Sequence, residues 1–169
     1  MSINKTALIR LLDLLANCEQ PAHSLQEIAD RIIEALESPQ AMQAAYGPDT
    51  QALAAENPAS SLLLALSYEL DDYFALGDSV DEIWEEILAA FETPAMPAFP
   101  YEEMPFQDIE SFFIWANEQL QLAHPDYGLI EFAHNPEYAF QLILIQHQYM
   151  DEILELCEQL GLTAANILE

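Results

Sequence analysis

The sequence predicts an α+β protein that is predominantly helical and carries a small antiparallel sheet including a C-terminal β-hairpin. Apolar residues recur at helical spacing in several separate segments, and two strand-like apolar segments flank Asn135-Pro136 late in the chain. The 169 residues are 52% hydrophobic and 10% aromatic, which is sufficient for a packed core and unlike acidic disordered chains. We therefore expect a single domain over residues 1–169.

Helical spacing dominates the beginning of the chain. A first helix is predicted by a stripe of four leucines, Leu8, Leu11, Leu12 and Leu15. Ser24 and Glu27 match a capping box, so we expect a second helix to begin there and to end at Pro39. The alanine-rich segment 41–55 is predicted to form turns, and a third helix is expected over residues 59–70.

A short strand and a charged helix are predicted next. Residues 73–77 fit either a continuation of the preceding helix or a short strand, and we favour the strand. Ser79 and Glu82 match a second capping box, and apolar side chains then recur at helical spacing up to Phe91. The opposite face of this helix carries acidic side chains. They lie near the helix N-terminus, where the positive end of the helix dipole stabilises negative charge.

Four prolines lie close together in segment 93–105, which excludes a regular helix and predicts an extended linker. Because the linker contains Phe99 and is followed directly by Phe106, we expect it to pack against the core. It separates a helical lobe over about residues 1–92 from an α-β-β-α lobe over residues 106–169.

The second lobe is expected to contain a helix, a hairpin and a final helix. The first helix is predicted over residues 108–122, and the two strands over 128–132 and 138–145. The second strand is apolar on both faces, which predicts a central strand or one covered twice. The last helix is expected over residues 149–160, with Gly161 as its stop.

The charge distribution is the strongest indication of function. No lysine or arginine follows Arg31, whereas 26 of the 30 acidic residues do, and the formal net charge is −27. Ion pairs within the chain cannot neutralise this excess, so the surface carries a field of one sign. Such a field repels nucleic acids and other anions and favours a cationic partner.

We interpret the protein as a highly acidic, non-enzymatic binding module whose target is a basic protein surface, as in an inhibitor, an immunity protein or a nucleic-acid mimic. Three acidic clusters are candidate partner-binding residues, and each could also be an ordinary solvated surface. They are Asp81, Glu82, Glu85 and Glu86; Glu102, Glu103, Asp108 and Glu110; and Asp151, Glu152, Glu155 and Glu158.

The alternative is a small metal-dependent or carboxylate-based hydrolase. If His134 and His147 lay on adjacent strands, they could form a metal site with Glu131 or Asp126 nearby as a further ligand. No glycine-rich phosphate loop and no nucleophile elbow is present, so we predict no cofactor, no catalytic residue and no dedicated metal site. A binding protein is therefore favoured over an enzyme.

We expect the protein to be cytoplasmic, with no direct binding to membranes or nucleic acids. Cys18 and Cys157 both fall at apolar positions of predicted helices, which is typical of reduced intracellular proteins. The N-terminal segment contains Asp13 within its apolar run and is predicted to be a helix instead of a signal peptide.

The order of elements resembles an uncharacterised family of small acidic bacterial proteins of unknown function. The resemblance covers roughly Leu62–Leu162: the short strand near 73–78, the capped acidic helix, the hairpin turn Asn135-Pro136-Glu137-Tyr138, and the closing helix that ends in Leu160-Gly161. It implies an α+β domain in a bacterial cytoplasm and no particular site residues.

Overall fold

The computed structural model describes residues 3–133 and 135–168 and shows an α+β fold with a four-stranded antiparallel sheet. In chain order its helices are α1 (Lys5–Leu15), α2 (Ala22–Ala35), α3 (Pro39–Tyr46), α4 (Pro48–Glu56), α5 (Ser61–Glu69), α6 (Val80–Ala89), α7 (Ile109–Ala123) and α8 (Met150–Gln159). Its strands are β1 (Phe74–Gly77), β2 (Tyr127–Phe132), β3 (Phe140–Gln146) and β4 (Ala164–Asn166). Short 3-10 turns cover Pro58–Ser60, Asp71–Tyr73 and His147–Tyr149.

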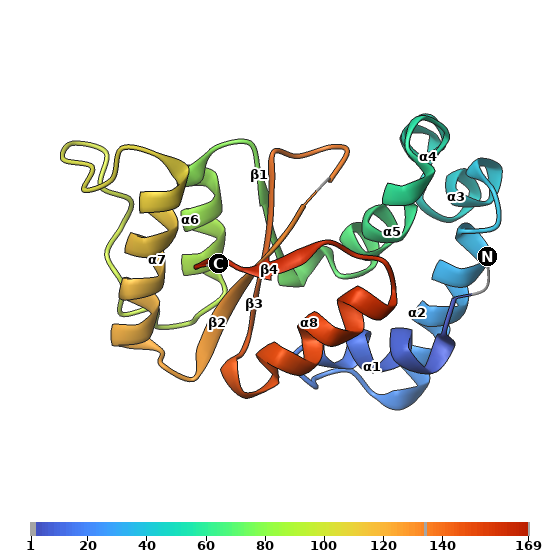
Figure 1. Ribbon diagram of the computed structural model, residues 1–169, viewed down its shortest axis with the longest axis horizontal. Coiled ribbons are helices and arrows are strands. Elements are labelled where there is room, and N and C mark those ends of the chain that lie inside the picture. The colour runs from blue at the N-terminus through green and yellow to red at the C-terminus, as the bar shows by residue number, and fades with distance from the viewer. Residues whose placement is uncertain (1–2, 134, 169) are drawn as a thin grey trace.

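The sheet lies between two helical layers (Figure 1). Helices α6 and α7 cover one face, and helices α1, α2, α5 and α8 cover the other. Each face has its own apolar cluster, because adjacent residues of a strand point to opposite sides. Leu142 belongs to the α6/α7 cluster and Ile143 to the α1/α8 cluster, and both are 0% exposed. The prediction that this strand is covered twice is confirmed.

The strand order is β1-β3-β2-β4, so β3 is central. The predicted hairpin is confirmed, with Ile130 opposite Ile143. The favoured strand near residues 73–77 is also confirmed, and it pairs with β3 so that Phe74 lies opposite Ile143. Segments on both sides of the Pro-rich linker therefore contribute strands to one sheet. Strand β4, which pairs with β2, was not predicted.

The first half of the chain is more helical than predicted. The expected turns over 41–55 are wrong, because this segment lies in α3 and α4. Pro39 occupies the first turn of α3 instead of ending α2, and Ser38 caps α3 by accepting a hydrogen bond from the Ala41 N–H at 3.0 Å. Proline is well suited to a first helical turn, and alanine is the best helix former. Gly47, at φ 107°, makes the break between the two helices.

Three further local predictions need correction. Helix α2 begins at Ala22 after Pro21, so Ser24 lies inside the helix and is not its cap. Ser79 occupies the N-cap position of α6 but makes no side-chain capping bond; the side chain of Glu82 instead accepts from the Asp78 N–H at 3.2 Å. Cys18 is exposed and follows α1 with a φ of 59°, whereas Cys157 is buried as expected.

The Pro-rich linker has no regular helix or strand between residues 90 and 108 and packs partly on α6 and α7. Phe99 and Phe106 are buried, and each ring contacts the ring of Phe112. The indole N–H of Trp84 donates to the carbonyl oxygen of Pro97 at 2.8 Å, which attaches the linker to α6.

Within the described residues, none of the helices has the length and apolar character needed to cross a bilayer.

Candidate binding surface

The few cationic side chains are all paired on one side of the sheet. Lysine and arginine occur only in α1 and α2, and each forms an ion pair within the chain. The pairs are Lys5 with Asp30 at 2.6 Å, Arg10 with Glu152 at 2.7 Å and Arg31 with Glu69 at 2.8 Å. The positive charge of the protein is thus neutralised locally on the α1/α2 side.

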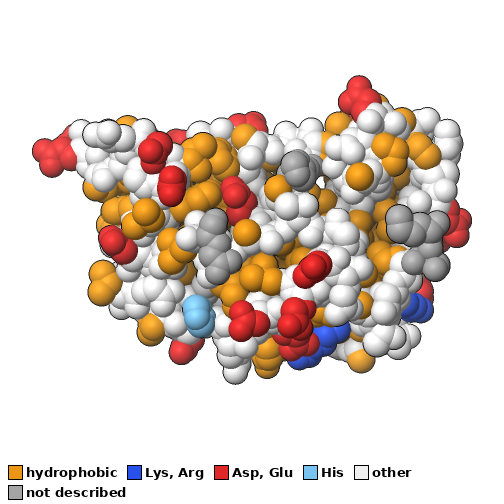
Figure 2. Space-filling view, viewed as in Figure 1, with side chains coloured by type: hydrophobic (Ala, Val, Ile, Leu, Met, Phe, Trp, Pro, Cys, Tyr) orange, Lys and Arg blue, Asp and Glu red, His pale blue; other side chains and the backbone are white. Residues whose placement is uncertain are grey.

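The opposite side has no cation to offset its acids. We call α6, α7 and the connection between them (residues 90–108, which includes the Pro-rich linker) the acidic layer. Residues 80–126, which contain this layer, include eleven aspartates and glutamates and neither lysine nor arginine. Figure 2 shows acidic and hydrophobic side chains interspersed over this end of the molecule, at the left, while the visible blue side chains lie near α1 at the lower right. A one-signed field is therefore concentrated on one layer of the fold.

The first two predicted clusters meet through a tyrosine. The hydroxyl of Tyr101 lies 3.1 Å from a carboxylate oxygen of Asp81 and 3.2 Å from one of Glu85, both on α6. Hydrogen bonds from the Ser79 side chain and from Tyr101 lower the pKa of Asp81. Because Glu102 and Glu103 directly follow Tyr101 and are exposed, this contact holds linker acids beside the acidic face of α6.

Two residues of these clusters have local structural roles. Asp108 is the N-cap of α7 and accepts from the Ser111 N–H at 2.8 Å; hydrogen bonds from the side chain and the backbone of Ser111 lower its pKa. Glu82 supports the start of α6 through its bond to the Asp78 N–H. Glu86 and Glu110, by contrast, are exposed on the helix surfaces.

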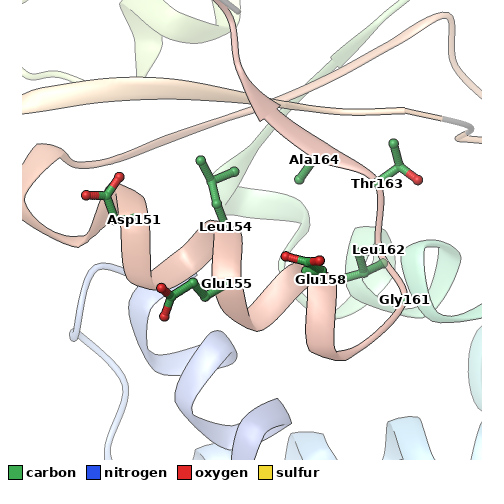
Figure 3. A pocket seen from close by; sticks show the side chains of 8 residues that line it. All are labelled: Asp151, Leu154, Glu155, Glu158, Gly161, Leu162, Thr163 and Ala164. Atoms are coloured by element: carbon green, nitrogen blue, oxygen red, sulfur yellow. The ribbon is translucent and has the colours of Figure 1, made fainter.

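The third cluster lies across the sheet on α8 and is divided. Glu152 turns toward α1, where hydrogen bonding to Arg10 lowers its pKa. The three other acids of this cluster are exposed. They line an open hollow of about 730 Å³ between α8 and the segment that leads into β4 (Figure 3). They are Asp151, Glu155 and Glu158. The structure therefore brings the α6 and linker acids together and keeps the α8 acids apart.

Helix α7 carries an exposed stripe that was not predicted from the sequence. Four residues spaced by four, Glu110, Ile114, Glu118 and Leu122, are all exposed and lie opposite the buried face of the helix. We call them the outer stripe. Its signal was present in the sequence, because Ile114 and Leu122 fall on the helical face opposite Phe112 and Ala116.

Exposed apolar side chains also concentrate in the acidic layer. The structure has eight large hydrophobic residues that are exposed among those it describes, and five lie between residues 101 and 122. They are Tyr101 at 62%, Met104 at 55%, Ile109 at 47%, Ile114 at 47% and Leu122 at 83%.

The metal-site alternative finds no geometric support in the described part of the chain. No three histidine, cysteine, aspartate or glutamate side chains among residues 3–133 and 135–168 are grouped so that they could hold a metal ion. His134, one of the two suggested ligands, lies outside the described residues, and His147 is exposed at the end of β3.

Glu131 is the one acid of β2, and burial raises its pKa. It lies opposite Leu142 and therefore faces the α6/α7 side of the sheet. A raised folded-state pKa means that ionisation destabilises the fold; this penalty is absent below the unfolded pKa and develops as the pH rises through the folded value.

We therefore expect Glu131→Gln to raise the melting temperature at about pH 7, and the gain to disappear on acidification to about pH 4. The exposed Glu118→Gln is the matched control, since it removes the same charge from the surface. Salt at about 500 mM should screen the surface repulsion and so remove the increase in melting temperature of Glu118→Gln. Most of the increase of Glu131→Gln should remain. Equal melting temperatures for wild type and Glu131→Gln at neutral pH would contradict the prediction.

Comparisons of the chain with protein-family models, with curated proteins and with solved structures found no match. The family resemblance suggested by the order of elements stays a prediction.

Proposed function

We propose that the protein is a non-enzymatic binding module that recognises a basic protein surface through its acidic layer. One observation carries the proposal: the cations are paired on the α1/α2 side, and the acidic layer contains none. Unneutralised carboxylates on a packed scaffold attract a cationic surface before contact and accelerate its association. Nucleic acids and anionic membranes carry the wrong charge for this surface.

The fold supports this role because the charged groups stand on ordered elements. Helix α6 is anchored by the buried side chains of Ile83, Trp84 and Ile87, so its acids have fixed positions. Tyr101 holds the adjacent linker on the same helix. A preorganised charged surface loses less conformational entropy on binding than a flexible acidic tail. We place the protein in a bacterial cytoplasm, which is compatible with its two free cysteines.

The test compares two variants with the same net charge. The first replaces four exposed acids of the acidic layer with glutamine, namely Glu102, Glu103, Glu110 and Glu118. The second replaces four exposed acids on the other side of the sheet with glutamine, namely Glu34 in α2, Glu37 just after α2, and Glu155 and Glu158 in α8. Each immobilised protein is used to capture basic proteins from a bacterial extract at low salt, and the affinity of the main captured protein is then measured.

We expect the first variant to bind about tenfold more weakly than wild type, because four exposed ion pairs at about 0.2 to 1 kcal/mol each together contribute about 0.8 to 4 kcal/mol. The second variant should change the affinity by less than about threefold. Equal losses would show attraction by net charge alone, and no loss in the first variant would remove the acidic layer as the binding surface.

A further inference from the structure

The outer stripe of α7 alternates acidic and apolar side chains along one ridge. Glu110, Ile114, Glu118 and Leu122 follow one another at intervals of four residues, so consecutive members are neighbours about 6 Å apart along the axis. The ridge is about 18 Å long at 1.5 Å per residue. Because the opposite face of α7 is buried in the core, this ridge is presented to the outside.

The apolar residues of the outer stripe are exposed, although they belong to a helix that packs on the core. Isolated exposed apolar residues are normal on proteins, but five of the eight large apolar residues that are exposed in the described chain lie between residues 101 and 122, and such local enrichment is typical of interaction sites. Leu122 is 83% exposed and Ile114 is 47% exposed, although the same helix buries Phe112 completely. Met104, at 55%, adds a further exposed apolar side chain from the linker.

From this geometry we infer that the outer stripe docks an amphipathic basic helix of the partner protein. The inference rests on the proposed function and adds the site and the chemistry of the partner. A helix with lysine or arginine and leucine alternating at four-residue intervals would place cations against Glu110 and Glu118 and apolar side chains against Ile114 and Leu122. Ridges formed by residues four apart pack into one another in the commonest class of helix–helix contact.

Charge selects this occupant over the other candidates. A second copy of the chain would bring together two molecules that each carry a net charge of −27. A helix that is apolar without cations would leave Glu110 and Glu118 partly desolvated and unpaired, which costs free energy. A cationic segment without apolar residues would leave Leu122 in water. Only a partner with both features satisfies the whole stripe.

A pair of synthetic peptides tests the inference. The first is a helical peptide of about 18 residues, about 27 Å long, with lysine and leucine alternating every fourth position along one face. The second has the same composition in an order that gives no such face. Binding is measured by fluorescence anisotropy at about 150 mM salt, where long-range attraction is largely screened. Wild type should bind the patterned peptide at least about tenfold more tightly than the shuffled one.

Two substitutions in the stripe should remove that preference. Leu122→Ser and Ile114→Ser are expected to weaken binding of the patterned peptide to the level of the shuffled peptide, and to leave the shuffled peptide unaffected. Leu168→Ser is the matched control, since Leu168 is a leucine with 51% exposure that follows β4 and is not part of the stripe. It should retain the full preference, and the melting temperatures of Leu122→Ser and Leu168→Ser should equal that of wild type.

Equal binding of the two peptides, or an equal loss in Leu168→Ser, would overturn the inference. The proposed function would then still stand if the variant with glutamine at positions 102, 103, 110 and 118 bound both peptides more weakly than wild type. It would fail separately if this variant bound both as tightly as wild type. Dimerisation of wild type at high salt that Leu122→Ser abolishes would assign the stripe to a second copy and would also overturn the inference.

Discussion

Replacing Trp84 with alanine is expected to lower the free energy of unfolding by about 3 to 5 kcal/mol, the range for truncating a buried tryptophan or phenylalanine. The Trp84 side chain is 0% exposed, and its ring lies 4.7 Å from the ring of Trp115 between centroids. The substitution also removes the donor to the Pro97 carbonyl, which is one of the contacts that hold the linker on α6. Urea denaturation followed by circular dichroism gives the change directly.

Two companion variants identify the cause of the loss. Glu86→Gln, on the exposed face of the same helix, should change stability by less than about 0.5 kcal/mol. Trp84→Phe keeps most of the apolar contact and removes the hydrogen bond. Its loss of stability should therefore lie between those of Glu86→Gln and Trp84→Ala. Trp115 is only half-buried, so its truncation should cost less than that of Trp84. If Trp84→Ala were as mild as Glu86→Gln, the assigned orientation of α6 would be wrong.

The second large effect is expected at two adjacent residues of the central strand. Leu142→Ala and Ile143→Ala should each lower the free energy of unfolding by about 2 to 5 kcal/mol. Their side chains enter different apolar clusters on opposite faces of the sheet, and both are completely buried. In a sheet with one solvated face, only one of two neighbouring positions would have such a cost.

The next residue of the strand provides the control. Leu144 is partly exposed, so Leu144→Ala should cost clearly less than either substitution. Equilibrium denaturation of all three variants under one set of conditions makes the comparison. A loss below about 1 kcal/mol at Leu142 or Ile143 would mean that one helical layer does not cover the sheet.

Local sequence patterns predicted the elements with strong apolar periodicity, among them α6, α7, α8 and the hairpin. Helices α3 and α4 were not predicted because proline and glycine commonly interrupt helices, whereas here Pro39 and Pro48 lie in the first turns of new helices. Strand β4 has the sequence Ala-Ala-Asn, which has no strand signal of its own. It is a strand because it pairs with β2, a contact that local patterns do not contain.

The charged surface was predictable in composition but not in arrangement. The absence of lysine and arginine after Arg31 is visible in the sequence. The hydrogen bond from Tyr101 to Asp81 joins residues 20 positions apart, and the ion pair of Arg10 with Glu152 joins residues 142 positions apart. These contacts follow from tertiary packing, so only the structure could separate the acidic layer from the α8 acids.

The most direct test of the acidic layer as the binding surface is amide hydrogen exchange of the wild-type protein with and without the patterned basic peptide. Exchange measured peptide by peptide along the chain locates the surface that binding protects. We expect added protection in the linker and in α7, and unchanged exchange in α2 and α8, although α8 also carries exposed acids. Protection of α8 equal to that of α7 would contradict a specific acidic layer and would show that the peptide follows net charge alone.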